Sequence, residues 1–341
     1  MKAITAGVLG AGRIGKIHAN NLMAMPGVRL KTIADPFADF KQWPGPAVAT
    51  SKNPEDVLKD PEIEAVLVCS STPSHADLTD AAARAGKHVF CEKPIAVDAE
   101  RVRATLATVA KSGVKLQEGF NRRFDPTFAR VRRAVIDGEV GDVQLVRVTA
   151  RDPAAPPIEY VKTSGGMFAD MTIHDFDMVR FLSGSEVEEV HAYGAVLVDP
   201  AIGAAGDIDT AVISMRLSNG ALAVIENSRQ AVFGYDQRIE VLGSKGGIEA
   251  FNETPARTVL RSGAGVRHEN PLYFFLERYQ RSFVLELEAF FASIRGDREP
   301  PAGGNDGLMA LLICLAANQS LRETRPVRVE KVASGAPKKA R

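Results

Sequence analysis

The sequence predicts a two-domain protein, with a parallel α/β domain followed by an α+β domain built on a largely antiparallel open sheet. Three observations support this prediction. The 341 residues exceed what one small hydrophobic core organises. Strand-like and helix-like patterns alternate up to about residue 120, whereas strand-like runs follow one another closely after residue 123. We therefore expect domains at 1–122 and 123–330, followed by a flexible tail at 331–341.

The N-terminal half alternates apolar runs with segments of helical periodicity. Strands are expected at "AITAGVLG", "VRLKTIAD", "AVATS", "AVLVCSS", "HVFCEK" and "VKLQEGF". Helices are expected at "RIGKIHANNLMAM", from Pro73 to Ala85 with Thr72 as N-cap, and from Asp98 to Lys111. Strands separated by helices form βαβ units, so this sheet should be parallel and covered on both faces.

The connection after Asp35 departs from this pattern. The segment "PFADFKQWPGP" contains three prolines and is barely long enough for a parallel crossover, which is usually helical. We expect a turn or a loop there, which would leave the adjoining end of the sheet more open than usual.

The C-terminal half begins with one expected helix, "PTFARVRRAVIDG", which ends at Gly138. Strands follow at "DVQLVRVTA", "EVEEVHAYGAVLV", "DIDTAVISMRL", "ALAVIENSRQ", "QRIEVLGS" and "GGIEA". Polar and apolar residues alternate in "VQLVRV" and "TAVISMRL", which indicates one buried face. Asn219-Gly220 predicts a hairpin turn, and helices at Phe274–Ile294 and Asn305–Glu323 close the chain.

The composition excludes several classes of partner. The 42 basic and 42 acidic residues balance, which argues against nucleic acid or an anionic membrane as the main partner. The three cysteines lie in apolar runs without metal-like spacing, so we expect buried free thiols in a reducing compartment. "MKAITAGVLG" lacks the apolar region of a signal peptide, and "LMALLICLAA" is too short to cross a bilayer. A cytoplasmic protein is the expectation.

A glycine motif connects the first expected strand and helix. Gly10-Ala11-Gly12-Arg13-Ile14-Gly15 has the spacing G-x-G-x-x-G, and Asp35 follows Gly15 by 20 positions at the end of the next strand. This context predicts a Rossmann dinucleotide-binding domain, with the pyrophosphate at the start of the helix. A carboxylate at Asp35 favours NAD over NADP, because a 2′-phosphate would meet like charge. A glycine turn without a ligand is the alternative.

The segment "GGMFADMTIHDFDMVRF" places ionisable residues among large apolar ones. At helical spacing Asp170, His174 and Asp177 share one face, which indicates an active site. Capping is the other interpretation, with Thr172 and Asp175 as a capping box or Asp170 as a cap. Capping does not account for the histidine, whose pKa of about 6.5 suits proton abstraction from an alcohol.

Seven segments together resemble the glucose–fructose oxidoreductase/inositol dehydrogenase (Gfo/Idh/MocA) family, and the resemblance spans Gly7 to about Glu323. They are "VLGAGRIGKIHA", "SSTPSHADL", "HVFCEKPIAV", "GFNRRFDP", "RDPAAPPIEY", "SGGMFADMTIHDFDMVRFL" and "FGYDQRIEVLGSKG". The E-K-P and D-x-x-x-H motifs mark the family, while the proline-rich loop and the histidine-bearing helix resemble its inositol branch. Family members are commonly tetramers, so the resemblance implies a homotetramer formed through the broad face of the antiparallel sheet.

The resemblance also implies roles for individual residues. Lys93 would contact the nicotinamide ribose and a substrate hydroxyl, although a lysine at a strand end can also be a plain surface residue. His174 would be the general base, and Asp170 would bind the substrate or orient the imidazole. The expected cofactor-binding residues are Gly10, Gly12, Arg13, Ile14, Gly15, Asp35, Ser71, Thr72, His75, Glu92 and Lys93. The expected substrate-binding residues are Asn121, Arg122, Tyr160, Asp170, His174 and Tyr235.

The activity that the resemblance implies is NAD-dependent oxidation of myo-inositol to 2-keto-myo-inositol (scyllo-inosose) by hydride transfer. No metal is expected, because the cofactor supplies the chemistry. Two alternatives stay open. The substrate could be scyllo-inositol or a pyranose sugar, or the chain could be a non-catalytic NAD-binding sensor. A sensor would not need Lys93, Asp170 and His174 together.

Overall fold

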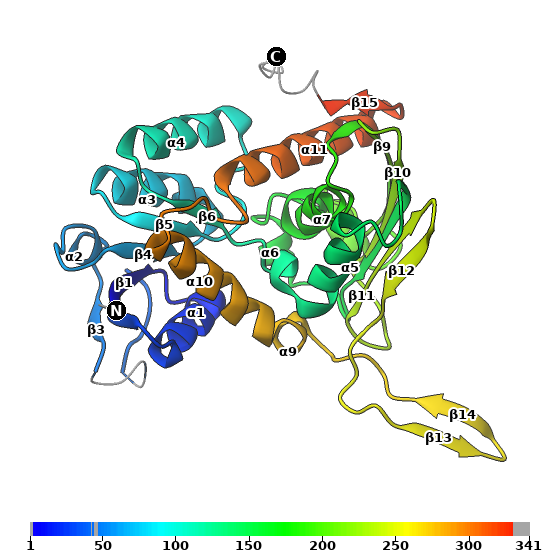
Figure 1. Cartoon of the computed structure of the whole chain (residues 1–341), viewed down its shortest axis with the longest axis horizontal. Helices are drawn as coiled ribbons and strands as arrows, with labels where there is room; N and C mark the ends of the chain where they lie inside the picture. The colour runs from blue at the N-terminus through cyan, green and yellow to red at the C-terminus, as the bar shows by residue number, and fades with distance from the viewer. Residues whose placement is uncertain (1–2, 42, 44–46, 330–341) are drawn as a thin grey trace. The chain divides into compact units, whose positions relative to one another are not determined.

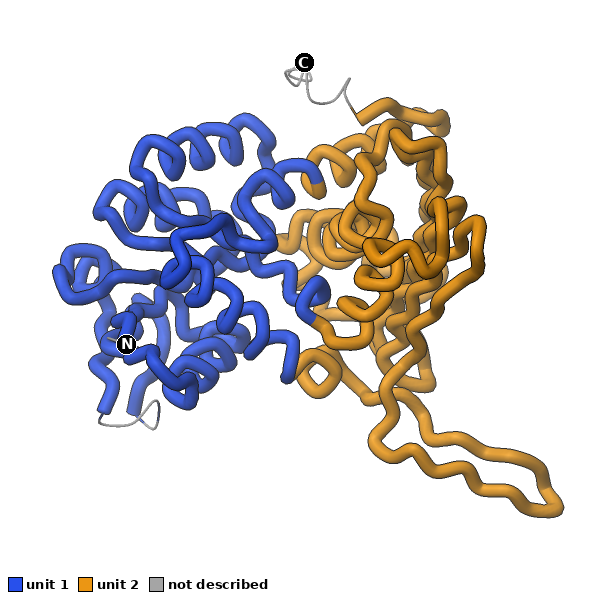
Figure 2. Tube along the Cα trace, viewed as in Figure 1, with its two compact units in different colours: residues 1–124, 281–309 blue, residues 125–280, 310–341 orange. Residues whose placement is uncertain are grey.

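The computed structural model describes residues 3–329 apart from 42 and 44–46, and the tail expected at 331–341 lies outside them. The chain divides into two compact units, coloured separately in Figure 2. The first unit contains the chain up to residue 124 together with 281–309. The second contains 125–280 and the described residues from 310 onward. The chain therefore changes unit near residues 124, 280 and 309, whereas a single boundary near residue 122 is expected from the sequence.

The first unit is built on a six-stranded parallel sheet with the order β3-β2-β1-β4-β5-β6 (Figure 1). Its strands are β1 (Ile4–Leu9), β2 (Val28–Ala34), β3 (Ala49–Ser51), β4 (Ala65–Val68), β5 (His88–Cys91) and β6 (Leu116–Glu118). All six coincide with strands expected from the sequence, and the parallel Rossmann-type sheet is confirmed. The strand order reverses between β1 and β4, and such a switch point is where open α/β sheets bind ligands.

The helices of the first unit alternate with its strands as expected, but the N-cap of one helix differs from the expected residue. They are α1 (Arg13–Ala24), α2 (Glu55–Leu58), α3 (Thr72–Arg84), α4 (Ala99–Ser112) and the 3₁₀ turn η1 (Asn121–Phe124). Asp98 caps α4, because its side chain accepts a hydrogen bond from the Arg101 N–H. Ser71 is the N-cap of α3, so the expectation that Thr72 has that place is wrong, and Ser71 makes no side-chain cap bond. The described residues between β2 and β3 contain no helix, as expected from the short connection.

Helix α10 (Gln280–Arg295) supplies part of the first unit's core, although the sequence predicts its segment within the second domain. Leu287, Phe290 and Phe291 are fully buried and pack in one cluster with Leu22 and Phe90. Their spacing of three and four residues places them on one helical face. An apolar stripe shows that a helix packs on a core, but it does not show which core.

The second unit contains a seven-stranded sheet with the order β12-β11-β7-β10-β9-β8-β15. Its strands are β7 (Val143–Arg151), β8 (Val187–Ala195), β9 (Thr210–Leu217), β10 (Leu222–Ser228), β11 (Asp236–Gly243), β12 (Gly246–Ala250) and β15 (Val327–Arg328). Only β7 and β10 pair in parallel, so the expected largely antiparallel sheet is confirmed. The expected turn at Asn219-Gly220 joins β9 to β10, and Gly220 has φ +87°.

Helices lie along this second sheet. They are α5 (Pro126–Ile136), α6 (Ile158–Val161), the π-helical turn η2 (Phe168–Thr172), α7 (Ile173–Ser183), α8 (Pro200–Ala204), α9 (Phe275–Arg278) and α11 (Gly304–Glu323), of which α11 begins in the first unit. Asp125 caps α5 by accepting from the N–H groups of Thr127 and Phe128. The single helix expected at Phe274–Ile294 is two helices, α9 and α10, separated at Tyr279.

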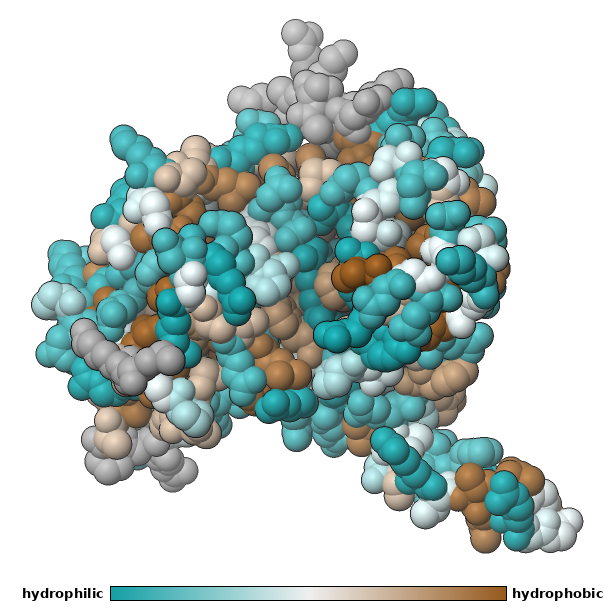
Figure 3. Space-filling model, viewed as in Figure 1, coloured by the Kyte–Doolittle hydropathy of each residue, from teal (hydrophilic) through white to brown (hydrophobic). Residues whose placement is uncertain are grey.

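A hairpin that the sequence analysis does not predict projects from the second unit (Figure 1). It pairs β13 (Val259–Ser262) with β14 (Gly265–His268). Leu260 and Val266 are exposed on it, and hydrophobic surface is visible there in Figure 3. Within the described part of the chain, the search for a helix of membrane-spanning length and hydropathy finds none.

Candidate active site

The glycine turn after β1 shows which of its glycines the fold itself requires. Gly10 has φ +103°, and a Cβ there would lie 2.5 Å from the backbone of Cys69 and Ser70. A Cβ on Gly15 would lie 2.1 Å from the Gly10 carbonyl oxygen. A Cβ on Gly12 meets nothing within 4 Å. The space beside Gly12, at the start of the twelve-residue helix α1, therefore fits a pyrophosphate approaching the backbone.

Asp35 joins this turn to the connection that follows β2. Its Oδ2 accepts a hydrogen bond of 2.7 Å from the Ala11 N–H. Its Oδ1 accepts bonds of 2.8 and 3.1 Å from the N–H groups of Phe37 and Ala38. These three bonds use both lone pairs of Oδ1 and one of Oδ2, which leaves the second lone pair of Oδ2 for a ribose hydroxyl.

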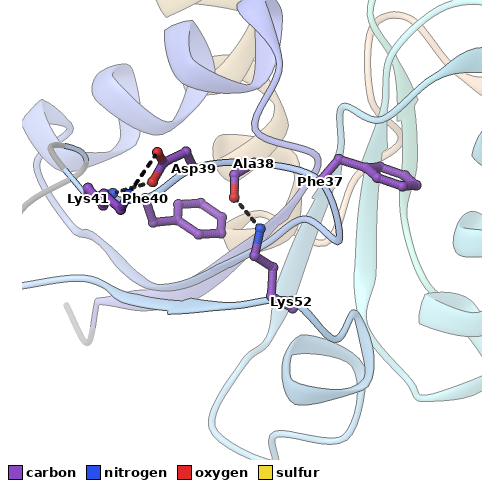
Figure 4. Close-up of a pocket in the computed structure, with 6 residues that line it drawn as sticks. All are labelled: Phe37, Ala38, Asp39, Phe40, Lys41 and Lys52. Atoms are coloured by element: carbon purple, nitrogen blue, oxygen red, sulfur yellow. Dashed lines mark hydrogen bonds and ion pairs between the residues drawn. The ribbon is translucent and has the colours of Figure 1, made fainter.

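An open cavity of about 530 Å³ lies beside this connection and is shown in Figure 4. It is lined by Phe37, Ala38, Asp39, Phe40, Lys41 and Lys52. The Lys52 ammonium donates to the Ala38 carbonyl and lies 5.7 Å from the centre of the Phe40 ring. A flat aromatic side chain and two lysines beyond Asp35 suit the adenosine end of a dinucleotide.

The loops after β4 and β5 are held together by His75, which is buried. Its Nδ1 lies 2.9 Å from the Pro94 carbonyl oxygen, and its Nε2 lies 3.0 Å from the Ser70 carbonyl oxygen. The expected cofactor residues Ser71 and Lys93 adjoin the two residues that His75 joins. His75 thus positions the backbone of the loops that follow β4 and β5, on one side of the switch point.

Glu92 has a partner that the sequence does not indicate. Its Oε1 lies 2.7 Å from His18 Nε2, and Oε1 of Glu286 on α10 lies 3.9 Å from the same nitrogen. Burial and then the nearby Glu92 charge raise the pKa of Glu286 well above its usual range. Among the described residues, these three side chains are a group of potential metal ligands within 4.8 Å of one another. Glu92 therefore reaches into the interior of the unit.

The second unit holds Asp170 and His174 on one continuous helical segment. Asp170 lies in the π-helical turn η2, and His174 follows in the first turn of α7. The Tyr160 hydroxyl, from α6 in the proline-rich loop, donates to Asp170 Oδ1 at 2.6 Å. Removal of that hydroxyl from water and then the Asp170 charge raise the pKa of Tyr160. Short π-helical turns within α-helices occur frequently at functional sites.

Asn227 on β10 connects two side chains of this segment. Its amide accepts from the Thr172 hydroxyl at 2.7 Å and donates to Asp175 Oδ2 at 2.9 Å. Thr172 is the residue before α7 but makes no side-chain cap bond, so the capping-box interpretation is wrong. Asp177 is buried within α7. Asp175 is buried as well, so Asp170, whose side chain is 13% exposed, is the partly accessible carboxylate of this segment.

The structure locates the remaining predicted substrate residues in different surroundings. Asn121 and Arg122 are buried in η1 of the first unit. Tyr235 is buried in the second unit, with its ring centre 6.0 Å from that of Tyr279.

The site predicted from the sequence lacks Arg229, which contacts Asp170, and Asp207, which lies near Arg229. Arg229 Nη1 donates to Asp170 Oδ2 at 2.9 Å, and its Nη2 lies 3.9 Å from Asp207 Oδ2. The only signal for Arg229 is its place two residues after Asn227, which puts both side chains on one face of an extended chain.

The chain resembles known proteins along nearly its whole length. The sequence model of an oxidoreductase family with an NAD-binding Rossmann fold matches residues 4–120, and that of the GFO/IDH/MocA C-terminal domain matches 128–249. The chain is 49% identical over 330 residues to myo-inositol 2-dehydrogenase of Thermotoga maritima, covering 96% of this chain and 98% of that protein. It is 48% identical over 332 residues to the uncharacterized oxidoreductase YrbE of Bacillus subtilis, covering 96% and 97%.

A solved structure is similar over the same range. The crystal structure of scyllo-inositol dehydrogenase from Lactobacillus casei, with bound NAD(H) and scyllo-inositol, aligns with a TM-score of 0.90 at 30% identity. The alignment covers 96% of this chain and 100% of that chain. Both units of the fold are thus shared with a protein whose structure holds a cyclitol and the dinucleotide.

Proposed function

Because the chain belongs to the GFO/IDH/MocA family of oxidoreductases, we propose that it oxidises myo-inositol to 2-keto-myo-inositol with NAD. The NAD-binding Rossmann fold is present, and the open space beside Gly12 suits the cofactor. The observation that carries the proposal is the partly buried Asp170 carboxylate, hydrogen-bonded by Tyr160, one helical turn before His174. A hydroxyl-rich substrate needs such a group of donors and acceptors next to a base.

Bound NAD supplies the acceptor for the hydride that leaves the alcohol carbon. In the first unit, Gly12 and the start of α1 would hold the pyrophosphate, and Oδ2 of Asp35 would accept a hydrogen bond from the adenosine ribose. Arg13, Ile14, Ser71, Thr72, His75 and Glu92 are proposed to line the dinucleotide, and Lys93 the nicotinamide ribose and a substrate hydroxyl. These roles agree with the position of the loops at the carboxyl ends of β1, β2, β4 and β5.

The second unit supplies the proton chemistry in this proposal. His174 accepts the hydroxyl proton as the hydride leaves, because an imidazole is basic enough near neutral pH. Asp170 accepts a hydrogen bond from a substrate hydroxyl or from the imidazole N–H. Tyr160, Asn121, Arg122 and Tyr235 are proposed to contact the other substrate hydroxyls.

A second candidate substrate is scyllo-inositol. The solved relative from Lactobacillus casei binds that isomer and shares the fold over 96% of this chain. The two cyclitols differ in the orientation of one hydroxyl, so a single hydrogen-bonding group decides between them. A site that hydrogen-bonds a substrate hydroxyl can reject a compound that cannot make this bond by a factor on the order of 10⁴ or more. The reason is that a buried polar atom of the site is then left unpaired.

The test is a kinetic panel with purified protein and NAD. NADH absorbance should rise with myo-inositol, with a kcat/KM at least about tenfold (about 1.4 kcal/mol) above that for scyllo-inositol, glucose or xylose. NMR of the product should show 2-keto-myo-inositol. A preference for scyllo-inositol would select the second candidate. NAD binding without turnover of any polyol would contradict both and leave a non-catalytic sensor.

We also propose that the protein is a homotetramer formed through the open face of the second unit's sheet. Leu145, Leu222 and Leu242 are directly paired neighbours across β7, β10 and β11, and the last two are exposed. A row of leucines on a sheet face is typical of a surface that another protein covers.

A further inference from the structure

A buried arginine lies behind Asp170. Arg229 directly follows β10, and only 2% of its surface is exposed. Its backbone N–H donates to the Asp209 carbonyl at 2.8 Å, which continues the pairing of β10 with the strand beside it. Its Nη1 donates to Asp170 Oδ2 at 2.9 Å. The backbone of Arg229 is therefore held by the sheet, and its guanidinium holds the Asp170 carboxylate.

Three carboxylates lie around the Arg229 guanidinium, namely Asp170, Asp152 and Asp207. Arg229 Nη1 lies 4.0 Å from Asp152 Oδ2, and Nη2 lies 3.9 Å from Asp207 Oδ2. A guanidinium stays charged at all working pH values, so Arg229 presents a fixed positive charge to these carboxylates. Within the described residues, Arg229 Nε and Nη2 and Asp207 Oδ2 are buried without a hydrogen bond. Loss of the guanidinium would leave three like charges in a poorly hydrated space.

The same group of residues fixes the direction of Asp170. Asp207 Oδ1 accepts from the Met167 N–H at 3.0 Å, which anchors the start of η2. Tyr160 occupies one lone pair of Asp170 Oδ1, and Arg229 occupies one of Oδ2. The plane of the carboxylate is thereby set. A substrate hydroxyl or an imidazole N–H would bind the same carboxylate, whose two oxygens offer about four lone-pair sites.

We propose that Arg229 is a positioning residue that keeps Asp170 ionised and directed toward the substrate. This inference rests on the proposed oxidation of a cyclitol, because it assigns Arg229 a part in that reaction. Arginine suits the task better than lysine, since its planar fork can bond Asp170 while facing two further carboxylates.

The experiment compares Arg229→Met and Arg229→Lys with the wild type in kcat, KM and NAD affinity over pH 5 to 10. The charged and titratable groups around the pair are Tyr160, Asp152 and Asp207, with His174 on the next turn. Arg229→Met should lower kcat/KM for the cyclitol about 10²-fold or more, with NAD affinity unchanged. Its acid limb in the pH profile should move up by roughly one unit or more, because His174, the proposed base, loses a nearby cation while the carboxylates around it stay, and this favours its protonated form.

Arg229→Lys should lower kcat/KM by about tenfold while its acid limb stays close to that of the wild type, since the charge remains but the fork is lost. Arg130→Met, at an exposed arginine on α5, is the matched control and should keep the wild-type profile. Thermal unfolding, monitored by circular dichroism, establishes whether each variant is folded. If Arg229→Met does not fold, Arg229→Lys carries the test alone.

The outcomes separate this inference from the function on which it rests. A wild type without turnover overturns the proposed oxidation and the inference together. An active wild type with Arg229→Lys within twofold of it overturns the inference alone. A folded Arg229→Met that loses activity without a shift of the acid limb also overturns it, because that result describes a purely structural arginine.

Discussion

At the scale of single residues, Glu286 shows how the core limits the ionisation of a carboxyl group. It is completely buried beside His18 and Glu92, and burial followed by the Glu92 charge raises its pKa. The folded state therefore keeps the proton of Glu286 above pH 4.5, where the unfolded chain releases it. Because the native state then binds more protons, stability falls as pH rises above 4.5 until the folded-state pKa is reached.

We predict that Glu286→Gln removes this loss of stability. The variant should match the wild type near pH 4.5 and become progressively more stable above it, by up to ~1.4 kcal/mol per pH unit. Urea unfolding at several pH values measures the difference. Glu288→Gln, at a half-exposed position on the same helix, is the control and should show no such trend. A constant difference between Glu286→Gln and the wild type across the pH range would contradict the assignment.

At the scale of elements, two glycines of the turn between β1 and α1 differ in their roles: Gly15 is needed for packing, and Gly12 for the proposed ligand binding. Gly15→Ala should destabilise the fold by roughly 1–3 kcal/mol, because its Cβ would overlap the Gly10 carbonyl oxygen. Gly12→Ala should leave the melting temperature nearly unchanged, since its Cβ meets open space.

The same Gly12→Ala variant should bind NAD at least about tenfold more weakly, because the methyl group occupies the approach of the pyrophosphate. Calorimetric titration with NAD measures the affinity. Gly263→Ala, in the hairpin turn between β13 and β14 and also next to open space, should bind NAD as the wild type does. Unchanged affinity of Gly12→Ala would exclude this turn as the pyrophosphate site.

The elements also show what the sequence can and cannot predict. The parallel sheet and the glycine turn could be predicted, because strand–helix alternation and the G-x-G-x-x-G spacing are local signals. The core that α10 joins could not, since an apolar stripe does not identify its partner. Arg229 lies 59 residues from Asp170, and nothing in "ENSRQ" distinguishes it from a surface arginine. The capping box failed because Asn227, distant in sequence, takes up the Thr172 hydroxyl.

At the scale of the whole molecule, the proposed tetramer depends on the leucine row of the second sheet. Leu222→Glu should reduce the mass of the particle, because a charge in a buried interface is costly without a partner. Sedimentation equilibrium or light scattering measures this mass. Ile136→Glu, at an exposed position on α5, should keep the wild-type mass. A tetramer that survives Leu222→Glu would place the interface elsewhere, and a monomeric wild type would end the proposal.

The proposed oxidation depends on His174 as the base that accepts the hydroxyl proton. The most direct measurement is the turnover of myo-inositol by His174→Ala, with NAD affinity measured on the same sample and His268→Ala, at an exposed histidine of β14, as the control. We predict that kcat falls by about 10²–10⁴-fold in His174→Ala while NAD still binds, and that His268→Ala keeps full activity. A His174→Ala variant with a kcat near that of the wild type would contradict it.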